Sequence, residues 1–191
     1  MKPDYLLLSC CAPCCVSVVE FLKKSGRCFG IVFYNPNIYP PSEYIKRRDE
    51  NERICRLFDV PFIELPYEPD VWQKEIAGFE NCPEQGQRCA LCFRMRLKKV
   101  AAYAAAHHIE TISSVLGVSR YKNWDQVVQQ AKIAVENLPV CYDETPWRKG
   151  GLENRRHQLI AQLQLYQQTY CGCPYSQKKT SARTPTQNLQ S

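Results

Sequence analysis

Four of the chain's twelve cysteines lie within residues 9–15, in the sequence Ser-Cys-Cys-Ala-Pro-Cys-Cys. They follow a short apolar run at residues 5–8 and precede an amphipathic run at residues 16–24. This order predicts a strand, a tight turn and a helix. Pro13 restricts the residue before it to an extended conformation, so the strand ends before the helix begins. In open α/β sheets such a turn lies at the carboxyl end of the strand, where ligands bind.

The rest of the chain alternates between strand and helix patterns. Strands are predicted at residues 29–34, 60–65 and 111–116, and helices at residues 42–58, 91–107, 125–136 and 152–168. This alternation predicts an α/β fold with a parallel sheet, helices on both faces and a C-terminal helical segment. We expect one domain over residues 1–175. Residues 176–191 are rich in Lys, Thr, Ser, Gln and Pro, so we expect a disordered tail there.

Composition limits the location and the partners. The chain has 191 residues and a net charge of +6, which is compatible with a nucleic-acid partner but does not require one. Only residues 5–8 are continuously apolar near the start, too few for a signal peptide, and no run approaches the length of a membrane span. We therefore expect a cytoplasmic protein without a membrane partner, in which clustered cysteines bind metal or perform redox chemistry.

Two further cysteine clusters follow the first one. Cys89 and Cys92 lie three residues apart at the start of a predicted helix, whose N-terminus favours thiolates and should lower the thiol pKa. This spacing is typical of a zinc half-site, a redox dithiol or half of an iron–sulfur site. Cys171 and Cys173 flank a glycine, and this pair is either a strained redox disulfide or a pair of metal ligands.

The number of thiols favours iron–sulfur over zinc. The three clusters supply more sulfurs than the four that one zinc ion takes. A [4Fe–4S] cluster takes up to four cysteines, and Cys10, Cys11, Cys89 and Cys92 supply that number. Among the other cysteines, Cys82 stays undecided. Buried structural positions are expected for Cys15, Cys28, Cys55 and Cys141.

Five motifs in this order resemble the cobalamin-independent epoxyqueuosine reductases, over about residues 5 to 176. They are the segments at residues 9–14, 89–92, 117–123, 149–152 and 170–174. The resemblance implies a fold similar to the adenine-nucleotide alpha-hydrolase-like proteins. It also implies the last step of queuosine synthesis, in which epoxyqueuosine in the tRNA anticodon loop is reduced to queuosine by an unidentified electron donor.

The resemblance also implies roles for individual cysteines. Cys10, Cys11, Cys89 and Cys92 match the positions that bind the [4Fe–4S] cluster. Cys171 and Cys173 match a pair that is redox-active or binds metal, and these two roles stay open. An additional iron is described in the family, and Cys14 is a secondary candidate ligand for it.

Basic and aromatic residues offer contacts for RNA. Tyr34, Tyr39 and Trp147 are candidates for stacking on a base, and Tyr121, Lys122 and Asp125 are candidates for supplying a proton. Three basic groups could face phosphates: Lys46, Arg47 and Arg48; Arg94, Arg96, Lys98 and Lys99; Arg148, Lys149, Arg155 and Arg156.

Two other functions are compatible with the pattern. One is an iron–sulfur tRNA thiolation enzyme on the same fold, which would normally need a glycine-rich nucleotide-binding turn. Residues 11–14 occupy that turn here and contain no glycine. The other is a non-enzymatic zinc or electron-carrier module, which would need neither the basic groups nor the polar loop at residues 119–123.

Overall fold

A five-stranded sheet, parallel throughout, forms the centre of the computed structural model, which describes residues 2–119 and 122–177. The strand order is β3-β2-β1-β4-β5. The strands are β1 (Tyr5–Ser9), β2 (Phe29–Phe33), β3 (Phe62–Glu64), β4 (Thr111–Ser114) and β5 (Cys141–Tyr142). Every strand pair is parallel, which confirms the predicted fold class.

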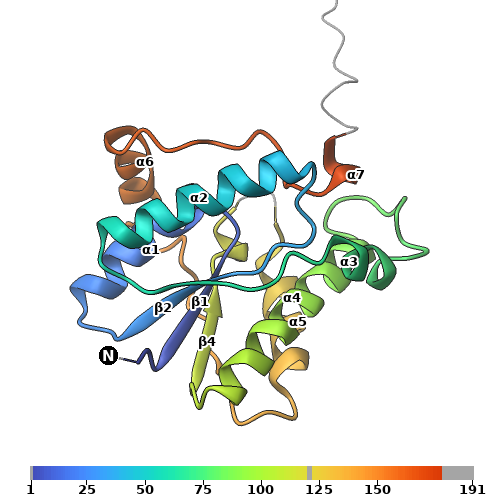
Figure 1. The fold of residues 1–191 in the computed structure, drawn as a ribbon, viewed down its shortest axis with the longest axis horizontal. Helices are drawn as coiled ribbons and strands as arrows, with labels where there is room; N and C mark the ends of the chain where they lie inside the picture. Colours follow the sequence, from blue (N-terminus) through green and yellow to red (C-terminus); the bar gives the residue numbers. More distant parts are fainter. Residues whose placement is uncertain (1, 120–121, 178–191) are drawn as a thin grey trace, which may run out of the picture.

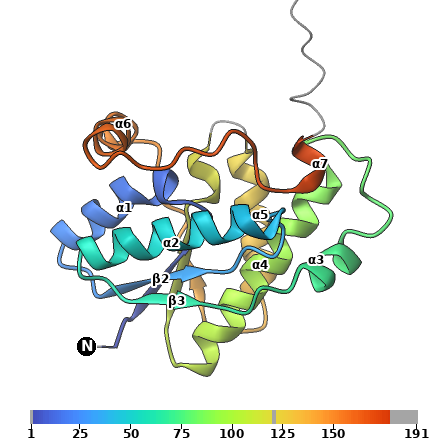
Figure 2. The same ribbon diagram turned by 45° about the horizontal axis from the view of Figure 1, so that its top comes forward.

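Helices cover both faces of the sheet (Figures 1 and 2). On one face, α1 (Ala12–Lys24) packs against α2 (Pro41–Leu57) and α6 (Leu152–Gln162). On the other face, α4 (Gln87–Ala106) packs against α5 (Trp124–Val135), and α3 (Pro69–Glu75) packs against α4. A short 3-10 helix (Leu116–Val118) follows β4, and α7 (Pro174–Gln177) ends the described chain.

The central strands form because their side chains are apolar on both faces. All five residues of β1 and of β2 are buried, as expected for parallel strands that lie between two helical layers. Tyr5 pairs with Phe29 on one side and Thr111 on the other, so β1 lies in the middle of the sheet. The turn that follows β1 is therefore surrounded by neighbouring elements.

Several predicted boundaries were wrong. The helix at residues 91–107 begins earlier, at Gln87, so both cysteines of the second cluster lie within α4. Asn123, and not Asp125, caps α5, because its side chain accepts a hydrogen bond from the Gln126 amide. Pro41 opens α2 in place of Ser42. The two-residue strand β5 was missed because its apolar pattern is too short to stand out.

The lone cysteines divide into two groups. Cys15 and Cys55 are buried in the core, as predicted. Cys28 is only half-buried and Cys141 is exposed, so the predicted burial of these two is wrong. Cys141 begins β5 at the edge of the sheet, where none of the other described strands covers it.

The C-terminal segment overlaps the last described helix. Residues 176 and 177 belong to α7, and the remainder of the predicted tail lies outside the described residues. Among the described residues, none of the helices has the length and apolar character needed to cross a bilayer.

A buried polar contact joins the end of β1 to α2. The Ser9 hydroxyl donates a hydrogen bond to Asn51 Oδ1 at 2.5 Å, and Asn51 Nδ2 donates to the Arg47 carbonyl at 2.6 Å. Asn51 is fully buried, so water cannot replace these bonds. This contact places α2 above the cysteine-rich turn.

We predict that Asn51→Ala lowers the free energy of unfolding by about 1–3 kcal/mol, because it leaves the buried Ser9 hydroxyl without its acceptor. Urea unfolding followed by circular dichroism measures the change. Asp49→Ala on the exposed side of the same helix is the control and should change stability by about 0.5 kcal/mol or less. Equal effects of the two substitutions would contradict the role of Asn51.

Candidate metal centre

Three cysteine sulfurs meet in the turn between β1 and α1. The Sγ atoms of Cys10, Cys11 and Cys14 all lie within 4.8 Å of one another, and those of Cys10 and Cys11 are 3.8 Å apart. All three residues are buried. The turn aims adjacent sulfurs at one point, which a regular strand cannot do. Cys14 therefore belongs to the same group as Cys10 and Cys11.

Hydrogen bonds and nearby cations make the three thiols unequal. Cys11 and Cys14 donate to the Cys10 sulfur and hold the Cys10 pKa well below its usual range, and the Lys122 ammonium, 3.7 Å away, adds to this effect. The pKa of Cys11 rises to about 12 and that of Cys14 also rises, because both thiols donate hydrogen bonds to the Cys10 sulfur and this favours their protonated forms. Gln168 Nε2 donates to Cys11 Sγ at 2.8 Å. The group thus stabilises a thiolate at Cys10.

The second and third cysteine clusters lie beside each other. A small pocket of about 20 Å³ is lined by all four of their cysteines, Cys89, Cys92, Cys171 and Cys173. Burial raises the pKa of Cys89 to about 11 and also raises that of Cys92. The predicted lowering of these pKa values by the helix N-terminus is therefore wrong for the metal-free protein. The free-energy cost of removing a thiolate from water is larger here than the stabilisation that the helix dipole provides.

One larger cavity joins all three clusters. Its volume is about 480 Å³, and its wall includes Cys10, Cys14, Cys89, Cys171 and Cys173. The predicted convergence of the three clusters is therefore what the structure shows. Cys82 lines neither space; its carbonyl accepts a hydrogen bond from Arg88 Nη1.

A buried arginine holds the third cluster in place. Arg47 on α2 donates from Nη1 to the Cys171 carbonyl at 3.0 Å and from Nη2 to the Tyr170 carbonyl at 3.2 Å. Its Nε donates to Glu43 at 2.7 Å, and the guanidinium lies over the Tyr170 ring, 5.2 Å from its centroid. The Gly172 carbonyl accepts from the Tyr39 amide at 2.8 Å. Both views show residues 163–173 running along α2 between α6 and α7 (Figures 1 and 2).

The cavity wall also carries charged side chains that could meet an anionic ligand. Lys122, Arg88 and Arg156 are among them, and Glu84 and Glu153 are interspersed. Of the three predicted proton sources, Lys122 faces the cavity. Asp125 is exposed outside its wall, and Tyr121 lies outside the described residues.

Some predicted RNA contacts are structural instead. Arg47 and Arg96 are only 2% and 1% exposed, and Arg96 donates to the Tyr34 carbonyl and to Asn35. Trp147 is buried and donates to Ser113 Oγ at 3.1 Å, and Tyr34 is also buried. These four side chains are not free to contact RNA, whereas Tyr39 is exposed.

Three polar side chains near the sulfurs were not predicted from the sequence. Gln168 donates to Cys11, and Trp72 and Arg88 line the small pocket with the second and third clusters. Nothing in their sequence context distinguishes them from ordinary surface or core residues. The positions of Gln168 and Trp72 depend on how residues 163–173 and α3 pack against the cysteines, which the sequence does not show.

Comparisons with known proteins agree on one family. A family model described as epoxyqueuosine reductase QueH matches residues 5–179. A protein of that description from Acinetobacter baylyi is 43% identical over 93% of this chain and 83% of its own length. Another, from Histophilus somni, is 42% identical over 92% of this chain and 73% of its own length.

A solved structure shows the same fold. It is a U34-tRNA thiolase, NcsA from Methanococcus maripaludis, described with its [4Fe-4S] cluster. The TM-score is 0.55 at 13% identity, over 92% of this chain and 62% of the thiolase chain. The likeness shows that this chain has the adenine-nucleotide alpha-hydrolase-like fold, as predicted.

We predict that Gly172→Ala displaces the third cluster. Gly172 has φ +112°, and an added Cβ would lie 3.0 Å from Ile38 Cγ1 and 3.1 Å from Arg47 Nη1. We expect unfolding stability to fall by about 1–3 kcal/mol. We also expect the rate of epoxyqueuosine reduction, measured on tRNA that carries this nucleoside, to fall by at least about tenfold, because Cys171 and Cys173 would be displaced. Gly26→Ala, at φ +73° with open space around it, is the control for backbone strain and should keep full turnover.

A second prediction concerns the Cys10 thiolate in metal-free, reduced protein. The pKa of Cys10 is lowered. The rate of Cys10 alkylation by iodoacetamide should therefore reach half its maximum at a pH below about 8.5, the pKa typical of a free cysteine. Lys122→Met should move this profile to higher pH, since the cation favours the thiolate. Site-resolved mass spectrometry measures the rates. Lys132→Met, at an exposed lysine paired with Glu144, should leave the profile unchanged.

Proposed function

Because this chain belongs to the epoxyqueuosine reductase QueH family, we propose that it reduces epoxyqueuosine in tRNA to queuosine with an iron–sulfur cluster held by its cysteine motifs. The observation that carries this proposal is the single cavity on which all three motifs meet. The family name describes an oxidoreductase, and clustered buried thiols are the ligands that iron–sulfur chemistry requires. We propose that residues 1–175 form the catalytic domain.

We propose that Cys10, Cys11, Cys89 and Cys92 bind a [4Fe–4S] cluster. The sulfurs of Cys10 and Cys11 are already adjacent, and Cys89 lines the same cavity as Cys10. The surroundings fit an anionic group. Arg96, Lys122 and Arg47 place positive charge near the sulfurs, and each opposes the high pKa that burial alone would give a thiol.

Cys14 offers an additional ligand. Its sulfur lies within 4.8 Å of those of Cys10 and Cys11, and it faces the cavity. We propose that Cys14 completes the binding of an additional iron at the edge of the cluster site. Thiolate ligands suit iron, and the two neighbouring cysteines share the same thiol-rich surroundings.

The reaction converts an epoxide into an alkene and water, which takes two electrons and two protons. A bound [4Fe–4S] cluster supplies electrons one at a time. We propose that Cys171 and Cys173 are, as a dithiol, the source of both electrons and both protons, because two thiols that close to one disulfide release two of each; a bound cluster would only carry these electrons to the substrate. Burial raises the pKa of Cys173 to about 12, so its thiol stays protonated until the dithiol is oxidised. An unidentified donor then reduces the disulfide.

The charged wall of the cavity supports a tRNA substrate. Arg156 and Lys122 line the cavity, as does His157, and all three come from parts of the chain other than the helix that carries Cys89 and Cys92. Cations in this position neutralise the phosphates on either side of a modified nucleoside. We propose a cytoplasmic location, where the many free thiols stay reduced.

The two rival functions receive less support. The thiolase that shares the fold is 13% identical, whereas the reductases are up to 43% identical over most of the chain. A zinc or electron-carrier module has no use for a cavity of about 480 Å³ with a charged wall. The reductase assignment explains both the sulfurs and the cavity.

We predict that Cys89→Ser lowers iron and acid-labile sulfide per chain by at least about half and abolishes turnover, because it removes one of the four proposed ligands. The measurement is metal and sulfide analysis after anaerobic reconstitution, with turnover measured on tRNA that carries epoxyqueuosine. Cys141→Ser, at an exposed cysteine outside the cavity, should behave like the wild type.

The same measurements on Cys171→Ser separate the two roles of the third cluster. A redox pair predicts unchanged iron and sulfide with turnover lost. Loss of about one iron per chain with sulfide unchanged would identify a second metal site instead. Wild-type protein that holds zinc and no sulfide after reconstitution would contradict the reductase proposal.

A further inference from the structure

The small pocket between the second and third cysteine clusters contains unpaired polar atoms. Trp72 Nε1, Arg88 Nε and Asn37 Oδ1 are all buried and have no hydrogen-bond partner among the described residues. All three residues line this pocket together with four cysteines. Buried N–H groups without an acceptor are costly and rare in folded proteins, so an acceptor is expected in the functional molecule.

The position of Trp72 identifies the acceptor. Trp72 lies on α3 and belongs to one apolar cluster with Cys92 and Cys173. The hydrogen-bond acceptors that line the pocket with the indole are the four cysteine sulfurs and Asn37 Oδ1, and of these the sulfurs of Cys92 and Cys173 share the apolar cluster with Trp72.

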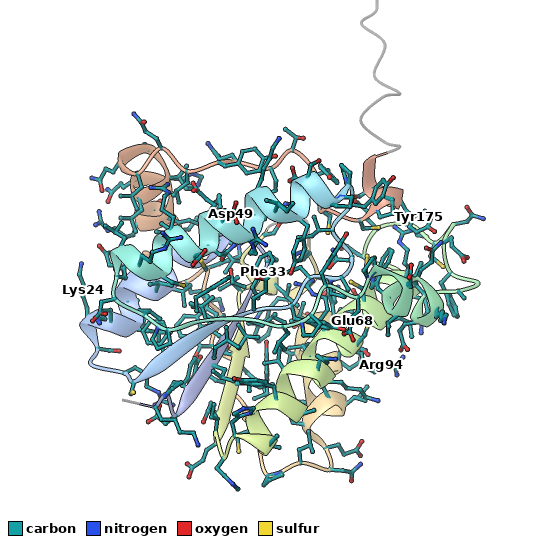
Figure 3. The ribbon with its side chains drawn as sticks, viewed as in Figure 1. Lys24, Phe33, Asp49, Glu68, Arg94 and Tyr175 are labelled. Atoms are coloured by element: carbon teal, nitrogen blue, oxygen red, sulfur yellow. The ribbon has the colours of Figure 1, made fainter. Side chains whose placement is uncertain are left out.

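The indole is also held in one orientation. Tyr175 of α7, labelled in Figure 3, lies against Trp72 with ring centroids 6.2 Å apart. The Arg88 guanidinium lies over the same Tyr175 ring, 5.3 Å from its centroid, and Arg88 Nη1 donates to the carbonyls of Glu80 and Cys82. Both unpaired donors are thus fixed in place by contacts that leave their N–H groups free.

We infer that the indole N–H of Trp72 donates a hydrogen bond to anionic sulfur at Cys92, and that this bond raises the reduction potential of the cluster bound there. The inference rests on the proposed cluster site. Hydrogen bonds to cluster sulfurs stabilise the reduced, more negative state, so they raise the potential. Arg88 Nε is a second donor of the same kind in the same pocket. Trp72 is a positioning residue, since it acts through the cluster and does not touch the substrate.

A buried water is the competing acceptor. A pocket of about 20 Å³ is large enough for one water molecule. Water in the pocket would satisfy the indole without reaching the cluster, and the potential would then not depend on Trp72. The experiment below separates the two acceptors.

The test compares the midpoint potential of the reconstituted cluster in the wild type, Trp72→Phe and Trp147→Phe. Phenylalanine keeps an aromatic ring at position 72 and removes the N–H donor together with part of the ring volume, and Trp147→Phe makes the same change at another buried tryptophan. We expect Trp72→Phe to lower the ratio of reduced to oxidised cluster at a fixed potential by about threefold to tenfold, where tenfold is about 59 mV for one electron. Trp147→Phe removes an indole N–H that donates to Ser113, outside the cavity, and should leave the potential unchanged.

A second measurement keeps the inference testable if Trp72→Phe does not fold. Wild-type protein grown with ¹⁵N-indole tryptophan should show a ¹⁵N coupling to the reduced cluster in pulsed electron paramagnetic resonance, and the Trp147→Phe protein should keep it. An unchanged potential in Trp72→Phe, or no ¹⁵N coupling, would overturn the inference while the cluster itself remains. A wild type without any iron–sulfur signal would instead overturn the proposed function, and with it this inference.

Discussion

The buried Arg47 guanidinium is the interaction on which the assembled site depends. It joins α2 to the carbonyls of Tyr170 and Cys171, more than 120 residues away in the sequence. Glu43 pairs with it, and Tyr166 donates a hydrogen bond to the other carboxylate oxygen of Glu43. A buried ion pair of this kind is tolerated because every charge has several partners. Without it, the third cysteine cluster would lose two of the hydrogen bonds that hold it opposite the first two.

Positive charge is distributed around the sulfurs in a way that suits an anionic group. Arg47 and Arg96 lie in the protein interior, where their charges are poorly screened by water. Lys122 approaches the same sulfurs from the loop that precedes α5. This field favours a thiolate at Cys10, whose pKa is lowered, while the pKa values of Cys11, Cys14 and Cys89 are raised. Binding of metal ions would let several of them ionise together.

The sequence predicted the parallel sheet, the place of the cysteine turn and the meeting of the three clusters. These follow from local signals, such as the apolar run before Cys10 and the spacing of Cys89 and Cys92. The roles of Arg47, Gln168 and Trp72 could not be predicted, because each depends on how residues 163–173 and α3 fold back onto the turn. The low pKa predicted for Cys89 was wrong because burial raises it, and the depth of burial is set by tertiary packing.

The most direct measurement of the central claim is the position of iron in crystals of anaerobically reconstituted protein, located by anomalous scattering at the iron absorption edge. The account predicts a compact iron peak inside the cavity, within bonding distance of the sulfurs of Cys10, Cys11, Cys89 and Cys92, with Cys171 and Cys173 at its edge. Iron bound by a different set of cysteines, or a single tetrahedral metal ion with no sulfide, would contradict it.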